Sequence, residues 1–367
     1  MGRQLFVCPL SAYFLILGGE CLNKTKNTGK NKFLIKLFGR FSILRYLCSN
    51  MLTSLPEEQR AQGRLFLFKA MIKTQYADTP LSVEEQIQLL KSRNLSFGSE
   101  VQARHLLQNV SLFRMKSYLY PFQSERVKHI YRDNATFEQV QELYQFDSCL
   151  RNLVFKRIEQ IEVSIRTKFG EAMVAATNQF WYSDPKNFRN HHSHSDLLNS
   201  INKELQRSDD EQIVSFFQSY TNTFPPSWMA MEVSSFGTLS LLYKCINAGT
   251  CKRDIANYYG LRDTVFESWI HSLVYVRNIC AHYSRLWNRN LRIQPKMPKN
   301  VSHPFVTQGV KTNRIYYVMC IIKYLLNTIE PDNNFTNQVN RLFGEYPDID
   351  KRAMNFPVNW EMERLWM

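Results

Sequence analysis

The feature that most constrains the fold is a long proline-free stretch, Thr136 to Met173, in which apolar residues recur at helical spacing. Residues three or four positions apart share one face of an α-helix, so this pattern predicts a helix with a continuous apolar face. Thr136 followed by Gln139 is the sequence signature of a helix N-terminus. We therefore predict one long helix that begins at Thr136. The apolar positions are Leu143, Leu150, Leu153, Ile158, Ile161, Ile165 and Phe169.

Shorter helical patterns fill most of the remaining chain after residue 79. Ser82 and Glu85 form a capping box before the first of them. Thr264 with Glu267 predicts a second box, Thr312 is a candidate N-cap, and residues 184–195 are predicted to be a polar loop. The predicted helices cover residues 83–93, 101–110, 196–205, 210–222, 227–247, 253–259, 264–287 and 313–329.

Turn-forming residues and strand patterns are scarce. Gly and Pro number 13 each, and no long segment alternates apolar and polar residues with period two. We therefore predict an all-α fold, a helical bundle with additional helices and little or no β-structure. The aromatic, proline-broken tail from Glu345 to Met367 is expected to pack on this body.

Residues 1–70 differ from the rest of the chain in charge. They hold 11 Lys/Arg and three Asp/Glu, a net charge of +8 out of the +14 of the chain. The apolar run Leu5–Leu17 resembles a signal peptide but is short for a transmembrane span. We favour an N-terminal extension (residues 1–70) outside the main fold, produced by a wrongly set start codon. A membrane-leaning segment or a basic RNA-binding arm are the alternatives.

The eight cysteines are scattered, with no CxxC pair and no compact framework. This usage predicts free thiols in a reducing cytoplasm. The body carries a net charge of only +6, so a polyanionic partner is permitted but not demanded.

Candidate catalytic residues lie in the segment VRNICAHYSRLWNR, Val276 to Arg289. On a helix with about 100° per residue, Asn278, His282 and Arg285 fall together opposite an apolar arc. Arg277 lies at the edge of that arc, where it must pair with a carboxylate, extend to solvent or bind an anion.

These residue types suit phosphodiester chemistry on RNA. Histidine transfers protons near neutral pH, and arginine binds phosphate with two parallel hydrogen bonds. Because RNA supplies its own 2′-OH nucleophile, the sequence predicts no requirement for a metal or another cofactor. Arg285 and Arg289 are candidates for neighbouring phosphates.

Other polar and aromatic residues have competing interpretations. The segment RNHHSH (Arg189 to His194) repeats the Arg-x4-His spacing, but we interpret it as a surface loop without a zinc site. The pairs Asp147/Arg151 and Glu162/Arg166 either stabilise a helix surface or orient an active-site arginine. Tyr118 and Lys116 either bind RNA, with the tyrosine stacked on a base, or belong to core packing. Core packing is the favoured role of five tryptophans: Trp228, Trp269, Trp287, Trp360 and Trp366.

Several long motifs resemble the Abi-like family, the AbiD/AbiF type of bacterial abortive-infection proteins. The resemblance covers roughly residues 75–362, which we treat as one domain, and leaves residues 1–70 outside. The motifs are LSVEEQIQLLKSRNL, FDSCLRNLVFKRIEQIEVSIRT, PPSWMAMEVSSFGTLSLLY, YGL, FESWIHSLVYVRNICAHYSRLWNR and LFGEYPDIDKRAMNFPVNW.

The resemblance implies a HEPN-type helical domain, grouped with metal-independent RNases that carry an Arg-x4–6-His motif. Here that motif is Arg277-Asn278-x3-His282. It also implies anti-phage defence by a toxin-like RNase and a homodimer that joins two motifs. A further implied partner is a small non-coding antitoxin or guide-like RNA. A non-catalytic RNA- or partner-binding module is the alternative. A membrane-acting toxin that uses Leu5–Leu17 is another, although we expect no stable membrane association.

Overall fold

The computed structural model describes residues 79–299, 301–306 and 309–367. Residues Leu81–Met367 form one compact unit, and the predicted extension with its apolar run Leu5–Leu17 lies outside the described residues. Within the described part, twelve α-helices accompany one small antiparallel pair of strands, which confirms the all-α prediction.

The helices, in chain order, are α5 (Val83–Ser92), α6 (Glu100–Asn109), α7 (Leu112–Leu119), α8 (Phe137–Ala176), α9 (His191–Arg207), α10 (Glu211–Ser219), α11 (Ser227–Val233), α12 (Phe236–Cys245), α13 (Thr250–Tyr258), α14 (Asp263–Ala281), α15 (Ile315–Ile329) and α16 (Phe335–Glu345). Strands β1 (Gln123–Glu125) and β2 (Ile130–Tyr131) pair between α7 and α8.

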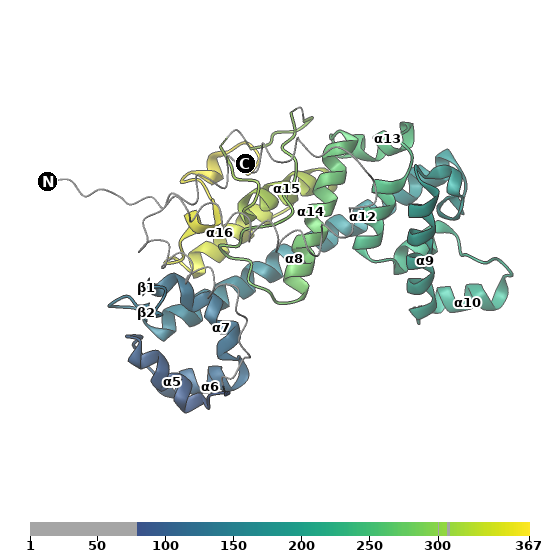
Figure 1. The fold of residues 1–367 in the computed structure, drawn as a ribbon. Helices are drawn as coiled ribbons and strands as arrows, with labels where there is room; N and C mark the ends of the chain where they lie inside the picture. The colour runs from purple at the N-terminus through teal and green to yellow at the C-terminus, as the bar shows by residue number, and fades with distance from the viewer. Residues whose placement is uncertain (1–78, 300, 307–308) are drawn as a thin grey trace, which may run out of the picture. The chain divides into compact units, whose positions relative to one another are not determined.

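Helix α8 is the element on which most of the others pack. It has 40 residues, so the rise of an α-helix gives it a length of about 60 Å. The predicted Thr136–Gln139 capping box begins it, and its apolar face is buried along almost the whole length. Figure 1 shows α8 running from α7 past α14 and α15 towards α12. The sequence pattern therefore predicted this helix correctly.

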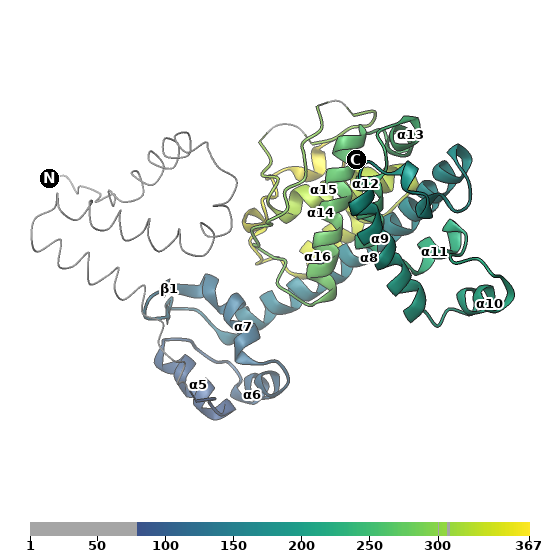
Figure 2. The ribbon, with the colours of Figure 1, turned by 45° about the vertical axis from the view of Figure 1, so that its right-hand side comes forward.

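Helix α15 is the second central element. Every residue from Ile315 to Leu326 is buried, because α15 is covered by α8, by α14 and by the C-terminal tail. Figure 2 shows α14 and α15 together over α8. Phe356, Trp360 and Trp366 of the tail are buried, as the sequence predicted for this segment.

Several predicted boundaries are wrong. Residues 227–247 form two helices, which Ser234 and Ser235 separate, and α9 begins at His191, inside the predicted loop. Arg314, not Thr312, is the N-cap residue of α15, and α16 was not predicted at all. Local pattern alone does not fix such boundaries, because the partner that a residue meets in the fold decides them.

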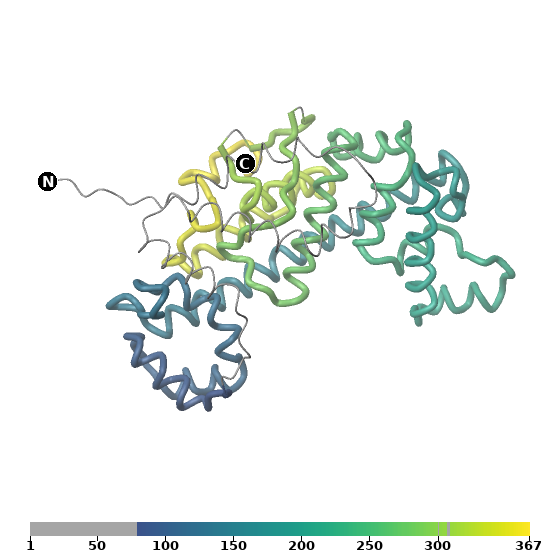
Figure 3. The backbone as a smooth tube through the Cα atoms, in the orientation of Figure 1, coloured from purple at the N-terminus to yellow at the C-terminus, as the bar shows by residue number. Residues whose placement is uncertain are grey.

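Between α14 and α15, residues 282–314 contain no helix where they are described, and Figure 3 follows the path of this segment. Its start is fixed to α8 by Asp147, whose side chain is fully buried. The Asp147 carboxylate accepts hydrogen bonds from the amides of Leu286 (3.0 Å) and Trp287 (2.5 Å).

The same carboxylate also accepts from the Tyr118 hydroxyl (2.6 Å) on α7 and pairs with Arg151 one turn along α8. Burial raises the pKa of Asp147, while Arg151 and the three hydrogen-bond donors favour the ionised form and oppose that rise. One buried side chain therefore joins α7, α8 and the segment after α14. One interpretation of the sequence placed the Asp147/Arg151 pair on a helix surface, but both side chains are buried.

We predict that Asp147→Ala lowers the free energy of unfolding by about 3–5 kcal/mol, because it leaves the Arg151 guanidinium buried without a counter-charge. Tyr118→Phe removes only one of the donors and is expected to cost about 1 kcal/mol. Urea denaturation of both variants measures the difference. A cost for Asp147→Ala no larger than that of Tyr118→Phe would contradict this role of the carboxylate.

Candidate functional site on helix α14

Helix α14 carries the candidate catalytic residues, but both of its ends differ from the prediction. Arg262 occupies the N-cap position and makes no side-chain cap, so the predicted Thr264–Glu267 capping box is wrong. The helix ends at Ala281 instead of Trp287, and His282 is its C-cap residue.

The early end has two visible causes. Tyr283 adopts a left-handed backbone, with a positive φ that cannot continue a right-handed helix. Asp147 then holds the amides of Leu286 and Trp287 on α8. Arg285 and Arg289 therefore do not extend the polar face of the helix, and the predicted grouping of Arg285 with Asn278 and His282 on one helical face is wrong.

Arg277 faces helix α8. Its guanidinium lies 5.4 Å from the centre of the Phe155 ring, and its Nε lies 4.0 Å from the Glu162 carboxylate. Its side chain remains 38% exposed. The guanidinium is therefore held against α8 and is still open to a ligand from solvent.

Glu162 is shared between two arginines. Its side chain is 14% exposed, and its second oxygen accepts a 2.8 Å hydrogen bond from Arg166. Burial raises the pKa of Glu162, and the positive charges of Arg166 and Arg277 oppose that rise. Of the two interpretations of the Glu162/Arg166 pair, the geometry favours the one in which the glutamate orients an arginine.

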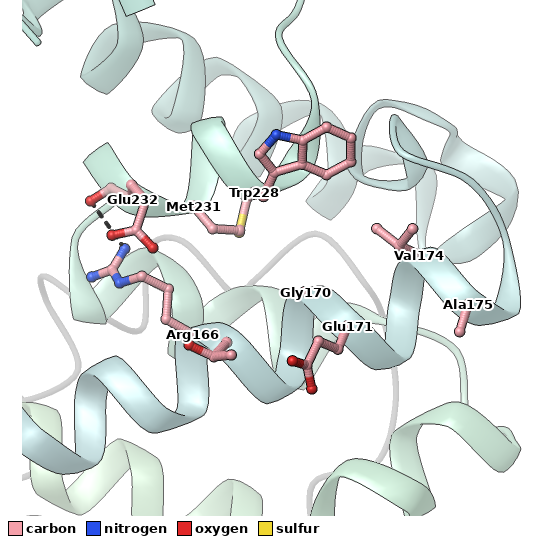
Figure 4. Close-up of a pocket in the computed structure, with 9 residues that line it drawn as sticks. Arg166, Gly170, Glu171, Val174, Ala175, Trp228, Met231 and Glu232 are labelled. Atoms are coloured by element: carbon pink, nitrogen blue, oxygen red, sulfur yellow. Dashed lines mark hydrogen bonds between the residues drawn. The ribbon is translucent and has the colours of Figure 1, made fainter. Parts of the chain in front are cut away.

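Arg166 links this network to a cavity of about 470 Å³ between α8 and α11, drawn in Figure 4. Its guanidinium donates to the backbone oxygens of Glu232 and Ser234, and the Trp228 side chain lines the same cavity. Trp228 is 54% exposed, so its predicted place in the core is wrong, whereas the other four tryptophans are buried.

Asn278 and His282 are both exposed at the end of α14. They are joined through the backbone, because the His282 amide donates to the Asn278 carbonyl (3.0 Å). The imidazole makes no hydrogen bond to any described residue, so it does not cap a neighbouring carbonyl as a structural histidine would. The ring is therefore accessible to a ligand from solvent.

Three arginines gather after the helix. Arg285 Nη1 approaches the Ser117 carbonyl of α7 at 3.4 Å, and Arg289 donates to the Arg285 carbonyl (3.1 Å). Burial lowers the pKa of Arg285, the Asp147 carboxylate opposes that fall, and the charges of Arg289 and Arg314 add to it. Three arginines on neighbouring segments favour an anionic ligand beside them. Arg314 was not a candidate from sequence.

The two candidates on α7 separate. Lys116 is exposed, but Tyr118 is only 2% exposed and bonds to Asp147, so the core-packing interpretation is right for Tyr118 and its candidate role in RNA binding is wrong. On α7, Tyr118 lies on the same face as Met115 and Leu119. This face packs against α8, which buries the tyrosine ring.

A sequence signal for a basic surface was missed. Residues 268–329 contain nine Lys/Arg and no Asp or Glu, and residues 101–124 contain three Lys/Arg and again no acid. Overall charge concealed this signal, because the acids lie elsewhere in the chain. The two acid-free segments meet where Arg285 reaches Ser117.

The second Arg-x4-His copy is part of a helix start. The Asn190 side chain caps α9, and His194 is buried with its Nε2 2.9 Å from the Tyr182 carbonyl. The predicted surface loop is therefore wrong for His194. Across the described ranges, no three His, Cys, Asp or Glu side chains are grouped so as to hold a metal ion.

These features define an all-α protein with an exposed Arg-x4-His pair at the end of a central helix. The sequence model of the Abi-like protein family matches residues 105–288, from α6 to just beyond the Asp147-bound amides. The chain therefore belongs to the Abi-like family, which gives it a role in abortive infection, the resistance to bacteriophage. No curated protein and no solved structure matches it. None of the helices among the described residues is both long and apolar enough to span a membrane.

We predict that Glu162→Gln lowers the free energy of unfolding by about 1–3 kcal/mol, because it removes the counter-charge of a buried arginine. Glu171→Gln is the matched control on the same helix: its carboxylate is 61% exposed and bonds to Lys168. That exposed pair is expected to contribute at most about 1 kcal/mol. Urea denaturation distinguishes the two, and equal costs would mean that Glu162 has no special role.

Proposed function

We propose that this Abi-like protein is a HEPN-type, metal-independent endoribonuclease that acts as a toxin in phage defence. The observation that carries the proposal is the pairing of an oriented arginine with an accessible histidine. Arg277 is held on α8 by Glu162 and Phe155, and His282 lies open at the end of the same helix. The acid-free segment around them suits a polyanionic substrate.

In this proposal His282 removes the proton from a 2′-OH or protonates the leaving 5′-oxygen. The 2′-oxygen bonds to phosphorus, the bond from phosphorus to the 5′-oxygen breaks, and the products are a 2′,3′-cyclic phosphate and a 5′-OH. Arg277 binds the scissile phosphate and offsets the charge that grows on it, and Asn278 orients it. Arg285, Arg289 and Lys116 bind neighbouring phosphates. An RNA substrate agrees with the expected cytoplasmic location.

The proposed active form is a homodimer. Arg277 and His282 lie about 140° apart around an ideal helix, and Arg277 turns towards α8. A second copy would bring its own histidine to the arginine of the first. Val163, next to Glu162, is an exposed apolar residue that such a copy would cover.

We expect expression of the full-length protein to arrest bacterial growth and fragment cellular RNA. Arg277→Ala or His282→Ala should lower the rate at which the purified protein cleaves RNA at least about 100-fold. His271→Ala is the control, because His271 is an exposed histidine on the same helix outside the site. Growth curves, RNA gels and circular dichroism test this. Cleavage that survives both substitutions would favour a non-catalytic RNA- or partner-binding module.

The shared site has its own test. In a mixture of equal amounts of Arg277→Ala and His282→Ala proteins, half of randomly formed dimers are mixed, and each has one intact Arg–His combination. If one arginine and one histidine from different copies suffice, cleavage should return to about a quarter of the parent rate. No recovery of cleavage after subunit exchange would contradict the shared site. The RNase proposal would then be tested only by the two single variants.

A further inference from the structure

We propose that helix α7 and residues 282–289 form a binding subsite for single-stranded RNA beside Arg277 and His282. In this subsite Tyr283 and Phe113 stack on unpaired bases, and the basic residues around them bind the phosphates. The inference rests on the proposed RNase function, since it names the form of RNA that the site takes.

Direct contacts join the two segments. Arg114 on α7 donates a 2.7 Å hydrogen bond to the Tyr283 carbonyl, and Arg285 approaches the Ser117 carbonyl at 3.4 Å. Tyr283 follows His282 directly in the chain. The surface of α7 is therefore continuous with the end of α14, where the candidate histidine lies.

Each segment exposes an aromatic ring. Tyr283 is 67% exposed and Phe113 is 83% exposed. Met115, Tyr118 and Leu119 cover the buried side of α7, and on a helix Phe113 lies on the opposite arc, between Arg114 and Lys116. The Lys116 ammonium is 6.0 Å from the centre of the Phe113 ring. Exposed rings between cations are the arrangement with which proteins bind single-stranded nucleic acids.

The two segments that carry these rings contain no acidic residue, and Asp147, the carboxylate that contacts both segments, is fully buried and paired with Arg151. Residues 101–124 and 268–329, which supply both segments, contain no Asp or Glu. Arg289 donates a hydrogen bond to the Arg285 carbonyl, and Arg314 donates one to the side chain of Asn288, the residue before Arg289. A polyanion is the partner that this surface complements.

The backbone of Tyr283 supports a functional role for its ring. Five described residues other than glycine have positive φ: Asn94, His129, Tyr283, Asn288 and Asn355. Asparagine and histidine tolerate this conformation better than most residues, whereas for a bulky residue it costs about 1–2 kcal/mol. The mostly exposed ring gains little from burial, so packing does not explain why a tyrosine occupies this strained position.

A base can stack on these rings only if it is not already stacked between its neighbouring bases. In duplex RNA the bases are paired and stacked inside the helix, so proteins reach mainly its phosphates and 2′-hydroxyls. The arginines can therefore bind either form of RNA, but Tyr283 and Phe113 can add affinity only for single strands.

The test measures binding by fluorescence anisotropy at one fixed salt concentration, with the full-length protein. The probe is a labelled, mixed-sequence 2′-O-methyl RNA, which lacks the nucleophile and is not cleaved, as a single strand or annealed to its complement. The variants are Tyr283→Asn, Tyr283→Phe and Phe113→Gln. Tyr220→Asn is the matched control, because Tyr220 is a 61% exposed tyrosine at the end of α10.

We expect Tyr283→Asn to weaken single-strand binding about 5- to 100-fold, which is the effect of losing one stacked base. Its thermal midpoint should stay the same or rise, because asparagine suits the left-handed backbone. Tyr283→Phe and Tyr220→Asn should bind as the parent does, and duplex binding should change little. Phe113→Gln should also weaken single-strand binding, and it decides the outcome if Tyr283→Asn does not fold.

Parent-like single-strand binding by folded Tyr283→Asn and Phe113→Gln would overturn the inference. So would an equal loss of duplex binding. If the variants instead lose only self-association, measured by sedimentation, the surface is a contact between copies of the chain. Cleavage of unmodified RNA by the parent, and its loss in Arg277→Ala and His282→Ala, tests the proposed function separately.

Discussion

The buried carboxylate of Asp147 determines how the candidate site is built. It pairs with Arg151 on α8, accepts a hydrogen bond from Tyr118 on α7 and holds the amides of Leu286 and Trp287. A buried carboxylate needs this many partners, because an unpaired charge in the core is costly. The segment after α14 is thereby drawn onto α8, and the helix that carries Arg277 and Asn278 ends at Ala281, with His282 as its C-cap residue.

Helix α8 acts on the site a second time, about four turns further along, through Glu162. This carboxylate lies between Arg166 and Arg277, so it fixes one arginine in the core and holds the other at the surface. Arg166 in turn bonds to backbone oxygens at the end of α11. The position of Arg277 therefore depends on the packing of α8 against both α14 and α11.

The basic and aromatic surface beside the site follows from the same packing. Asp147 holds Tyr118 inwards, which turns the opposite arc of α7, with Phe113 and Lys116, to solvent. The chain reversal at Tyr283 brings a second exposed ring and the arginines of residues 285–289 next to that arc. In the function that we propose, this surface and the neighbouring Arg277 and His282 hold RNA on both sides of a scissile phosphate.

The sequence by itself determined the all-α class, the long helix with its Thr136 cap, the Ser82 cap and the family motifs, because helical periodicity and capping are local properties. Only the tertiary structure decided where α14 ends, that Tyr118 is buried, that Trp228 is exposed and that Glu162 contacts Arg277. Each of these depends on groups far apart in the chain, such as Asp147 and Leu286, which are 139 residues apart. A pattern read along the chain shows which face of a helix is apolar, but it does not show which partner that face or its polar edge meets.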